Sequence, residues 1–172
     1  MGARQQGANA TQHRWLTMPR TLSFVINGDD VLMLKRDAGK RVFPNQYNGL
    51  GGHVERDEDV RSSALREIEE ESGLIVHSLR LCSIHNIDAG EASGILLFVF
   101  TAISDTRDLK PETPEGALEW ISIDRVLDYD LVEDLPQLLP RIFDLPDGHG
   151  PLYAHVGYDE GDQIRLRFAE PA

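Results

Sequence analysis

The sequence contains very little cysteine, no long apolar run and a shortage of positive charge. Cys82 is the single cysteine in 172 residues, which excludes a disulfide within the chain, and its apolar neighbours indicate a small core residue rather than a nucleophile. No stretch approaches the roughly 18 consecutive apolar residues of a membrane span. The first residues also lack the apolar segment of a secretory signal. These absences predict a cytoplasmic protein without a membrane partner.

The charge balance narrows the class of ligand. The chain has 17 lysines and arginines against 29 aspartates and glutamates, a formal net charge of −12 at pH 7. Polymeric nucleic acid requires a basic surface, so it is excluded as a partner. A small anionic substrate is still compatible, because a bound cation inverts the local field. An acidic protein that acts on phosphates therefore almost requires a metal.

The most informative stretch is residues 52–74, GHVERDEDVRSSALREIEEESGL. Its second part predicts a helix, with Asp59 as the N-cap, because its carboxylate can accept from free N–H groups of the first turn. Gly73 is the expected C-terminal stop, since glycine takes the left-handed conformation without penalty. The helix has a narrow apolar stripe. The stripe consists of Val60, Ala64 and Ile68.

Three glutamates lie beside this stripe. At about 100° per residue, Glu67 and Glu70 fall along its edge and Glu71 falls within it. Crowded carboxylates repel one another and resist desolvation, so the arrangement favours a cation among them. Mg²⁺ prefers oxygen ligands and shares them with substrate phosphates. The alternative is a glutamate-rich helix face in solvent, which is common for such a run.

The spacing of this stretch resembles the signature of the Nudix hydrolases at all nine constrained positions over 23 residues. The matching residues are Gly52, Glu58, Arg66, Glu67, Ile68, Glu70, Glu71, Gly73 and Leu74. The resemblance implies a Mg²⁺-dependent enzyme, with Mn²⁺ as a substitute, that hydrolyses a diphosphate linkage in a small nucleotide. A non-catalytic nucleotide-binding module is the alternative from another class, but degenerate members usually lose motif glutamates and none is lost here.

The resemblance also implies roles for individual residues. Glu67, Glu70 and Glu71 would bind the metal together with the carbonyl of Gly52. Arg66 would pair with Glu58 and orient the metal-binding carboxylates, as a fork of two charge-assisted bonds does. A general base must take the proton from the attacking water. Three residues are candidates for this base, in the order Glu70, Glu112 and Glu115.

Three further features resemble the MutT-homologue branch, whose members hydrolyse oxidised purine nucleoside triphosphates such as 8-oxo-dGTP. They are LMLKR and YNGLGG before the motif, EW with an acidic residue near 119–124, and a C-terminal hairpin. By this resemblance Asn48, Glu133 and Asp134 would read the purine. Lys35 and Arg36 end a predicted strand and would face the phosphates, with an exposed strand end as the alternative. Gly51 would let the backbone approach the ligand.

Other interpretations of these residues remain open. Asn48 before glycine is also typical of a turn, and Glu133 with Asp134 is also typical of a helix N-terminus. The branch has a tryptophan just before the acidic pair, where this chain has Leu131 and Val132. ADP-ribose, another nucleotide sugar or a dinucleoside polyphosphate is the alternative substrate.

The element order predicts an α+β fold of the Nudix type, an α/β/α sandwich around a mixed sheet with the motif loop and helix at the active site. Residues 1–19 are expected to be a flexible tail, with the first strand beginning at Thr21. Residues 20–172 are expected to form one domain that includes the final hairpin. A helix is predicted over residues 132–143, interrupted at Pro136. The chain is expected to act as a monomer or homodimer.

Overall fold

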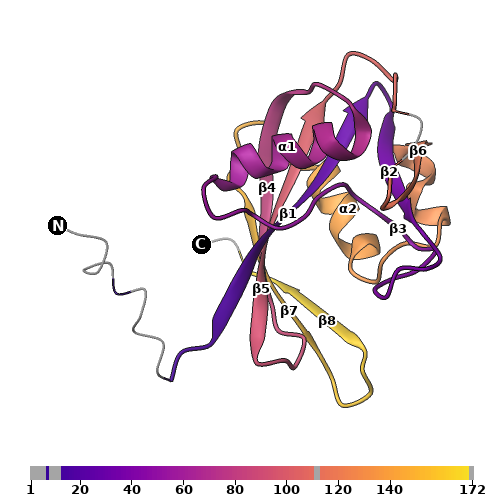
Figure 1. Cartoon of the computed structure of the whole chain (residues 1–172). Helices are drawn as coiled ribbons and strands as arrows, with labels where there is room; N and C mark the ends of the chain where they lie inside the picture. The colour runs from indigo at the N-terminus through magenta and orange to yellow at the C-terminus, as the bar shows by residue number, and fades with distance from the viewer. Residues whose placement is uncertain (1–6, 8–12, 111–112, 171–172) are drawn as a thin grey trace.

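One mixed sheet of eight strands forms the centre of the molecule (Figure 1). The computed structural model describes residues 7, 13–110 and 113–170. The strands are β1 (Leu16–Asn27), β2 (Asp30–Arg36), β3 (Tyr47–Asn48), β4 (His77–Ile87), β5 (Ser93–Ile103), β6 (Gly116–Ser122), β7 (Leu152–Tyr158) and β8 (Ile164–Phe168). The helices are α1 (Val60–Ser72), the 3₁₀ helix η2 (Ile123–Asp128) and α2 (Leu135–Phe143).

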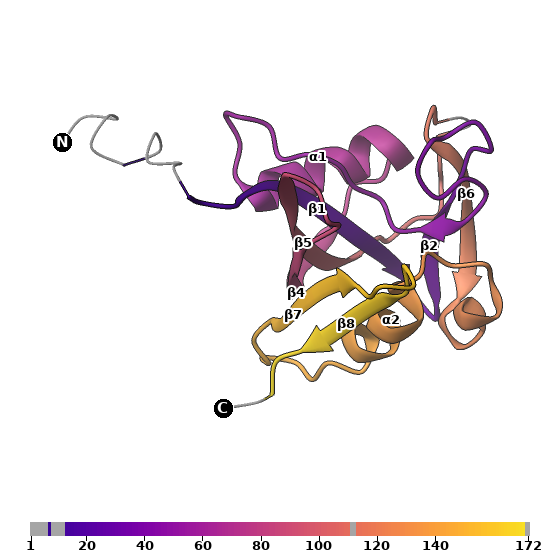
Figure 2. The same ribbon diagram turned by 90° about the horizontal axis from the view of Figure 1, so that it is seen from below.

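The sheet lies between the two α-helices. Its strand order is β3-β2-β1-β5-β4-β7-β8, and β6 pairs with β2 off this path. The β1–β5 and β4–β7 pairs are parallel, whereas the other named pairs are antiparallel. Seen from below, α1 covers one face and α2 lies on the other, while the β7–β8 hairpin extends the sheet beyond β4 (Figure 2). The predicted α+β sandwich with a mixed sheet is therefore confirmed.

Each face of the sheet has its own hydrophobic cluster. Successive strand residues point to opposite faces, so Phe24 joins the cluster under α2 and Val25 joins the one under α1. The α2 side also contains the fully buried Cys82, as its apolar neighbours predicted. Among the described residues, no helix is long and apolar enough to cross a membrane.

Strand β1 is longer than predicted. It begins at Leu16 rather than Thr21 and pairs with β5 from Leu16↔Ser93 onward. Residues 16–19, which were expected to belong to the tail, are therefore strand residues. The sequence pattern missed them because they are mostly exposed and include Pro19, which strands tolerate at an edge. Of the expected tail, residues 1–6 and 8–12 lie outside the described part.

Helix α2 also differs from its prediction. It begins at Leu135, three residues later than expected, and Pro136 lies in its first turn instead of interrupting it. An N–H in the first turn has no partner within a helix, so proline is accepted there. The later start leaves Val132, Glu133 and Asp134 in the approach to the helix, where their side chains are available to a neighbouring cleft.

A divergence of two strands makes room for the motif. Pairing of β1 with β2 covers only the pairs from Val25↔Leu32 to Asn27↔Asp30. Beyond these pairs, residues 49–53 lie along β1 instead, through bridges Arg20↔His53 and Ser23↔Leu50. The glycine run is thus held against the sheet at the point where the chain leaves for α1.

Candidate active site

Helix α1 has the predicted ends. Asp59 Oδ1 accepts hydrogen bonds from the backbone N–H of Arg61 at 2.8 Å and of Ser62 at 3.0 Å. Gly73 takes a left-handed φ of 78°, and its N–H donates to the Glu69 carbonyl at 2.8 Å. Both caps are confirmed, so α1 begins and ends where the sequence predicts.

The Arg66 guanidinium connects three glutamates. Its Nε donates to Glu58 Oε2 at 3.0 Å and its Nη2 to Glu58 Oε1 at 2.8 Å. Its Nη1 lies 2.9 Å from both Glu67 Oε1 and Glu70 Oε2. Arg66 itself does not line the cleft described below, so its influence on a ligand passes through these carboxylates.

Glu71 is the buried member of the cluster, with 7% of its surface exposed. Its Oε2 accepts from the Gly51 N–H at 2.9 Å. Burial is the main cause that raises the pKa of Glu71 to about 7, and the nearby Glu67 and Glu115 carboxylates contribute to this rise against the lowering effect of the Gly51 bond. A cation beside Glu71 would favour its charged form.

The glycine run approaches these carboxylates closely. Gly51 has a φ of 149°, and a Cβ there would lie 2.1 Å from the Thr21 carbonyl oxygen. A Cβ on Gly52 would lie 2.5 Å from Glu67 Oε1. The Gly52 carbonyl accepts from the Thr21 N–H at 2.9 Å, which turns it toward β1 and uses one of its two lone pairs. Metal binding by this carbonyl stays a prediction.

A cleft of about 750 Å³ brings most of the predicted site residues together. Those that line it are Asn48, Gly51, Gly52, Glu67, Glu70, Glu71, Glu115, Glu133 and Asp134. Glu112 lies outside the described residues, so its candidacy as a base is not placed. The carboxylates of α1 and the residues expected to read a purine therefore share one continuous space.

Lys35, like Arg66, is a predicted site residue that does not line the cleft. Its side chain is exposed and lies over the Tyr47 ring, with Nζ 5.6 Å from the ring centroid. Its neighbours Leu34 and Arg36 line the cleft, because successive residues of β2 face opposite sides. Phosphate contact by Lys35 stays a prediction, whereas Arg36, named with it from the sequence, lines the cleft.

The far end of the cleft contains the acidic pair. Asp134 is the N-cap residue of α2, but its side chain makes no capping hydrogen bond. Burial raises the pKa of Asp134 to about 6, with a smaller contribution from Glu133. Asn48 Oδ1 accepts from the Gly49 N–H at 2.9 Å, as a turn residue does, and this leaves its amide N–H groups for a ligand.

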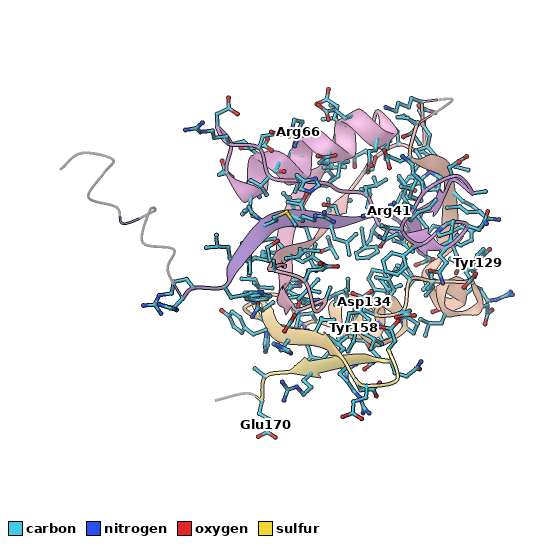
Figure 3. The ribbon with its side chains drawn as sticks, turned by 60° about the horizontal axis from the view of Figure 1, so that its bottom comes forward. Arg41, Arg66, Tyr129, Asp134, Tyr158 and Glu170 are labelled. Carbon is cyan, nitrogen blue, oxygen red and sulfur yellow. The ribbon has the colours of Figure 1, made fainter. Side chains whose placement is uncertain are left out.

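Several lining residues had no signal in the sequence. Arg20 and Leu22 come from the same face of β1, and Arg20 Nε is buried without a hydrogen-bond partner among the described residues. Val156, Tyr158 and Ile164 come from the C-terminal hairpin. The alternation along β1 could have placed Arg20 beside Leu22, but no local pattern could bring the hairpin to the motif. Figure 3 shows Arg66 on α1, and Asp134 and Tyr158 on the opposite side of the sheet.

Comparison with known proteins identifies the family. The NUDIX domain family model matches residues 16–142. The chain belongs to the Nudix family. It is 35% identical over 112 residues to an oxidized purine nucleoside triphosphate hydrolase of Danio rerio, a match that covers 62% of this chain and 67% of that protein.

Two further Nudix relatives differ in how much of them is matched. A segment of 53 residues is 42% identical to the m7GpppN-mRNA hydrolase NUDT17 of Danio rerio, covering 31% of this chain and only 18% of that protein. The crystal structure of a MutT protein from Bacillus halodurans shares 25% identity and a TM-score of 0.74, covering 90% of this chain and 99% of that one. The chain is thus a Nudix pyrophosphohydrolase, an enzyme class that acts on small nucleotides and generally uses divalent metal ions.

The residues of this Nudix site fit a divalent ion by their chemistry. The carboxylates of Glu67, Glu70 and Glu71 line the same cleft as Gly52, where a Cβ would lie 2.5 Å from Glu67 Oε1. Hard divalent ions prefer this set of oxygen donors. Within residues 13–110 and 113–170, no three His, Cys, Asp or Glu side chains are already placed to hold one ion. Arg66 pairs with Glu67 and Glu70, and the Gly51 N–H bonds Glu71.

Proposed function

We propose that this Nudix enzyme hydrolyses purine nucleoside triphosphates, with oxidised purines of the 8-oxo-dGTP type preferred, to the monophosphate and pyrophosphate. One observation carries this proposal: a single cleft of about 750 Å³ contains both the α1 carboxylates and the Asn48 and Asp134 side chains. A nucleotide can therefore place its phosphates at one end and its base at the other. The likeness to the Danio rerio purine triphosphate hydrolase supports the same substrate class.

Glu67, Glu70 and Glu71 are the proposed ligands of Mg²⁺, with backbone oxygens of the glycine run beside them. When bound, Mg²⁺ would neutralise the negative charge that develops on the phosphate oxygens. Glu71 holds its place through the Gly51 N–H, and Glu67 through Arg66. The helix thus keeps two carboxylates in fixed positions before a substrate arrives.

Glu70 is the proposed general base. Its side chain is 59% exposed and lines the cleft, so water reaches it, and Arg66 fixes one of its oxygens. It would take the proton from the water that attacks phosphorus. Glu115, the remaining candidate in the described part, has its Oε1 2.9 Å from Lys40 Nζ, which commits this oxygen to an ion pair.

Asn48, Glu133 and Asp134 are the proposed readers of the base. The Asn48 amide can donate while its oxygen is held by Gly49. With a pKa of about 6, Asp134 can accept as a carboxylate or donate as an acid near neutral pH. Such a carboxyl suits an oxidised purine, in which oxidation converts an acceptor nitrogen of the ring into a donor.

A Mg²⁺-dependent turnover panel tests the proposal. It would compare 8-oxo-dGTP, 2-hydroxy-dATP, dGTP, ADP-ribose and a diadenosine polyphosphate, with every product identified. The expected result is the highest kcat/KM for an oxidised purine triphosphate, with release of pyrophosphate. Preference for ADP-ribose or the polyphosphate would reject the substrate assignment and keep the carboxylate chemistry.

Substitution on α1 tests the base within the same panel. Glu70→Gln should retain the fold and lower kcat by about 10²- to 10⁴-fold. Glu69→Gln is the matched control, because Glu69 is an exposed neighbour on the same helix outside the cleft lining. Equal activity of the two variants would remove Glu70 from this role.

A further inference from the structure

The C-terminal hairpin supplies part of the cleft although it lies beyond the matched Nudix region. The family match ends at residue 142, whereas β7 and β8 follow at Leu152–Tyr158 and Ile164–Phe168. Parallel pairing of β7 with β4 attaches the hairpin to the sheet from Ser83↔Leu152 to Ile87↔Val156. The hairpin is therefore a fixed wall of the cleft, built by residues that the family pattern does not constrain.

Alternation along β7 decides which side chains face the cleft. Val156 and Tyr158 share one face and line the cleft. Tyr153 lies on the opposite face and is 57% exposed, compared with 38% for Tyr158. The strand thus presents two partly exposed tyrosines of which only one can meet a ligand in the cleft.

Tyr158 lies at the acidic end. Burial raises the pKa of its phenol, and the nearby negative charges of Glu133 and Asp134 raise it further. Figure 3 shows Tyr158 next to Asp134. No hydrogen bond to its hydroxyl is formed within residues 13–110 and 113–170, and its Cα partner in β8 is the apolar Ile164. Its ring is therefore available at the place where the base would be read.

The cleft otherwise has few aromatic faces. Leu131 and Val132, which precede the acidic pair, are buried aliphatic residues of the cluster under α2. Phe43 also lines the cleft, but it packs against that same cluster from the loop after β2. If Asp134 bonds the edge of a purine, the flat face of the base still requires an apolar contact. Stacking on an aromatic ring provides such a contact.

We propose that Tyr158 is a specificity-determining residue whose ring stacks on the nucleobase, so that the C-terminal hairpin sets the preference for a base. This inference rests on the proposed function, because it assumes a purine at the acidic end. The ring, rather than the hydroxyl, makes the contact.

Equilibrium binding tests the inference without any need for turnover. The ligands are the α,β-methylene analogue of dGTP, which resists cleavage, and inorganic tripolyphosphate, which has no base, both with Mg²⁺. The variants are Tyr158→Leu, Tyr158→Phe and the matched control Tyr153→Leu. Tyr158→Leu should weaken binding of the analogue about tenfold. The other two variants should stay within about twofold, and tripolyphosphate should bind all forms equally.

Each of the other possible outcomes contradicts a different part of the proposal. The stacking role is wrong if Tyr158→Leu and Tyr153→Leu bind the analogue with the same affinity. It is also wrong if Tyr158→Leu lowers the affinity for tripolyphosphate as much as the affinity for the analogue. The proposed function stands in both cases. If wild type binds tripolyphosphate but gains nothing from the base, both the stacking role and the purine assignment fail. Tyr158→Trp guards against a folding defect in the leucine variant, because it keeps an aromatic face and should bind the analogue at least as tightly as wild type.

Discussion

Arg66 and Glu58 form a fork of two hydrogen bonds, Nε to Oε2 at 3.0 Å and Nη2 to Oε1 at 2.8 Å. The bond from Arg66 is the main cause that lowers the pKa of Glu58 to about 2. Because Glu58 lies in the loop before α1, the fork joins loop and helix, and its free Nη1 then reaches Glu67 and Glu70. One guanidinium thereby positions the carboxylates that are proposed to act on the substrate.

Arg66→Lys should lower kcat by about ten- to a hundredfold, the usual cost of losing a group that orients metal ligands. Lysine keeps the charge but cannot form the two-bond fork. KM should change by less than about threefold, because Arg66 does not line the cleft. Arg61→Lys on the same helix is the control, since Arg61 is exposed and its guanidinium donates to the Leu79 carbonyl but to no glutamate among the described residues. A large rise in KM with unchanged kcat would contradict the positioning role.

Alanine at the two motif glycines should separate folding from activity. In Gly51→Ala the new Cβ meets the Thr21 backbone 2.1 Å away at a φ of 149°, so the free energy of unfolding should fall by about 3 kcal/mol. In Gly52→Ala the three atoms nearest the Cβ belong to the flexible end of Glu67, so stability should change by less than about 1 kcal/mol. Mg²⁺ affinity and turnover of Gly52→Ala should nevertheless drop. Thermal unfolding and Mg²⁺ titration measure these outcomes, and full activity of Gly52→Ala would count against the metal site.

Glu71 should make the metal-free protein less stable as pH rises. Its pKa rises from 4.5 to about 7 on folding, so the folded state binds more protons between these values. The stabilisation is complete below pH 4.5 and is lost as pH rises through 7. Each pKa unit is worth about 1.4 kcal/mol, so the loss is up to about 3 kcal/mol.

Comparison with Glu71→Gln isolates this effect from other titrating groups. With a chelator present, the stability of the variant relative to wild type should grow between pH 4.5 and 7 and then level off. Saturating Mg²⁺ should reverse the difference above pH 7, because only wild type offers a carboxylate to the ion. Urea unfolding at a series of pH values gives the result, and a constant difference would contradict the burial effect.

Arg20→Gln should weaken nucleotide binding. Arg20 and Arg36 are the cations among the described lining residues, and Arg20 Nε is buried with no hydrogen-bond partner in that part of the chain. A charge-assisted bond to a phosphate would satisfy it, so KM should rise about tenfold and depend less on salt concentration. Arg125→Gln is the control, because Arg125 pairs with Asp128 outside the cleft. Equal KM values in both variants would show that the substrate does not contact Arg20.

Local sequence signals predicted the elements whose stabilising contacts are made between residues close together in the chain. Asp59 and Gly73 end α1 through bonds to residues at most four positions away, so the sequence contains both partners. The boundary of β1 at Leu16 was missed, because that part is stabilised by β5, about 77 residues later in the chain. The sequence did not separate Lys35 from Arg36 for a similar reason, since only the pairing of β2 shows which side of the strand faces the cleft.

The sequence alone determined the chemistry of the motif: nine residues at fixed spacing, a capped helix and three glutamates on one side of it. Spacing suffices there because a helix converts sequence separation directly into geometry. Only the tertiary structure decided what faces those glutamates. Arg20, Asp134 and Tyr158 reach the cleft from three elements far apart in the chain, and long-range sheet pairing, which leaves no local pattern, is the physical reason they meet.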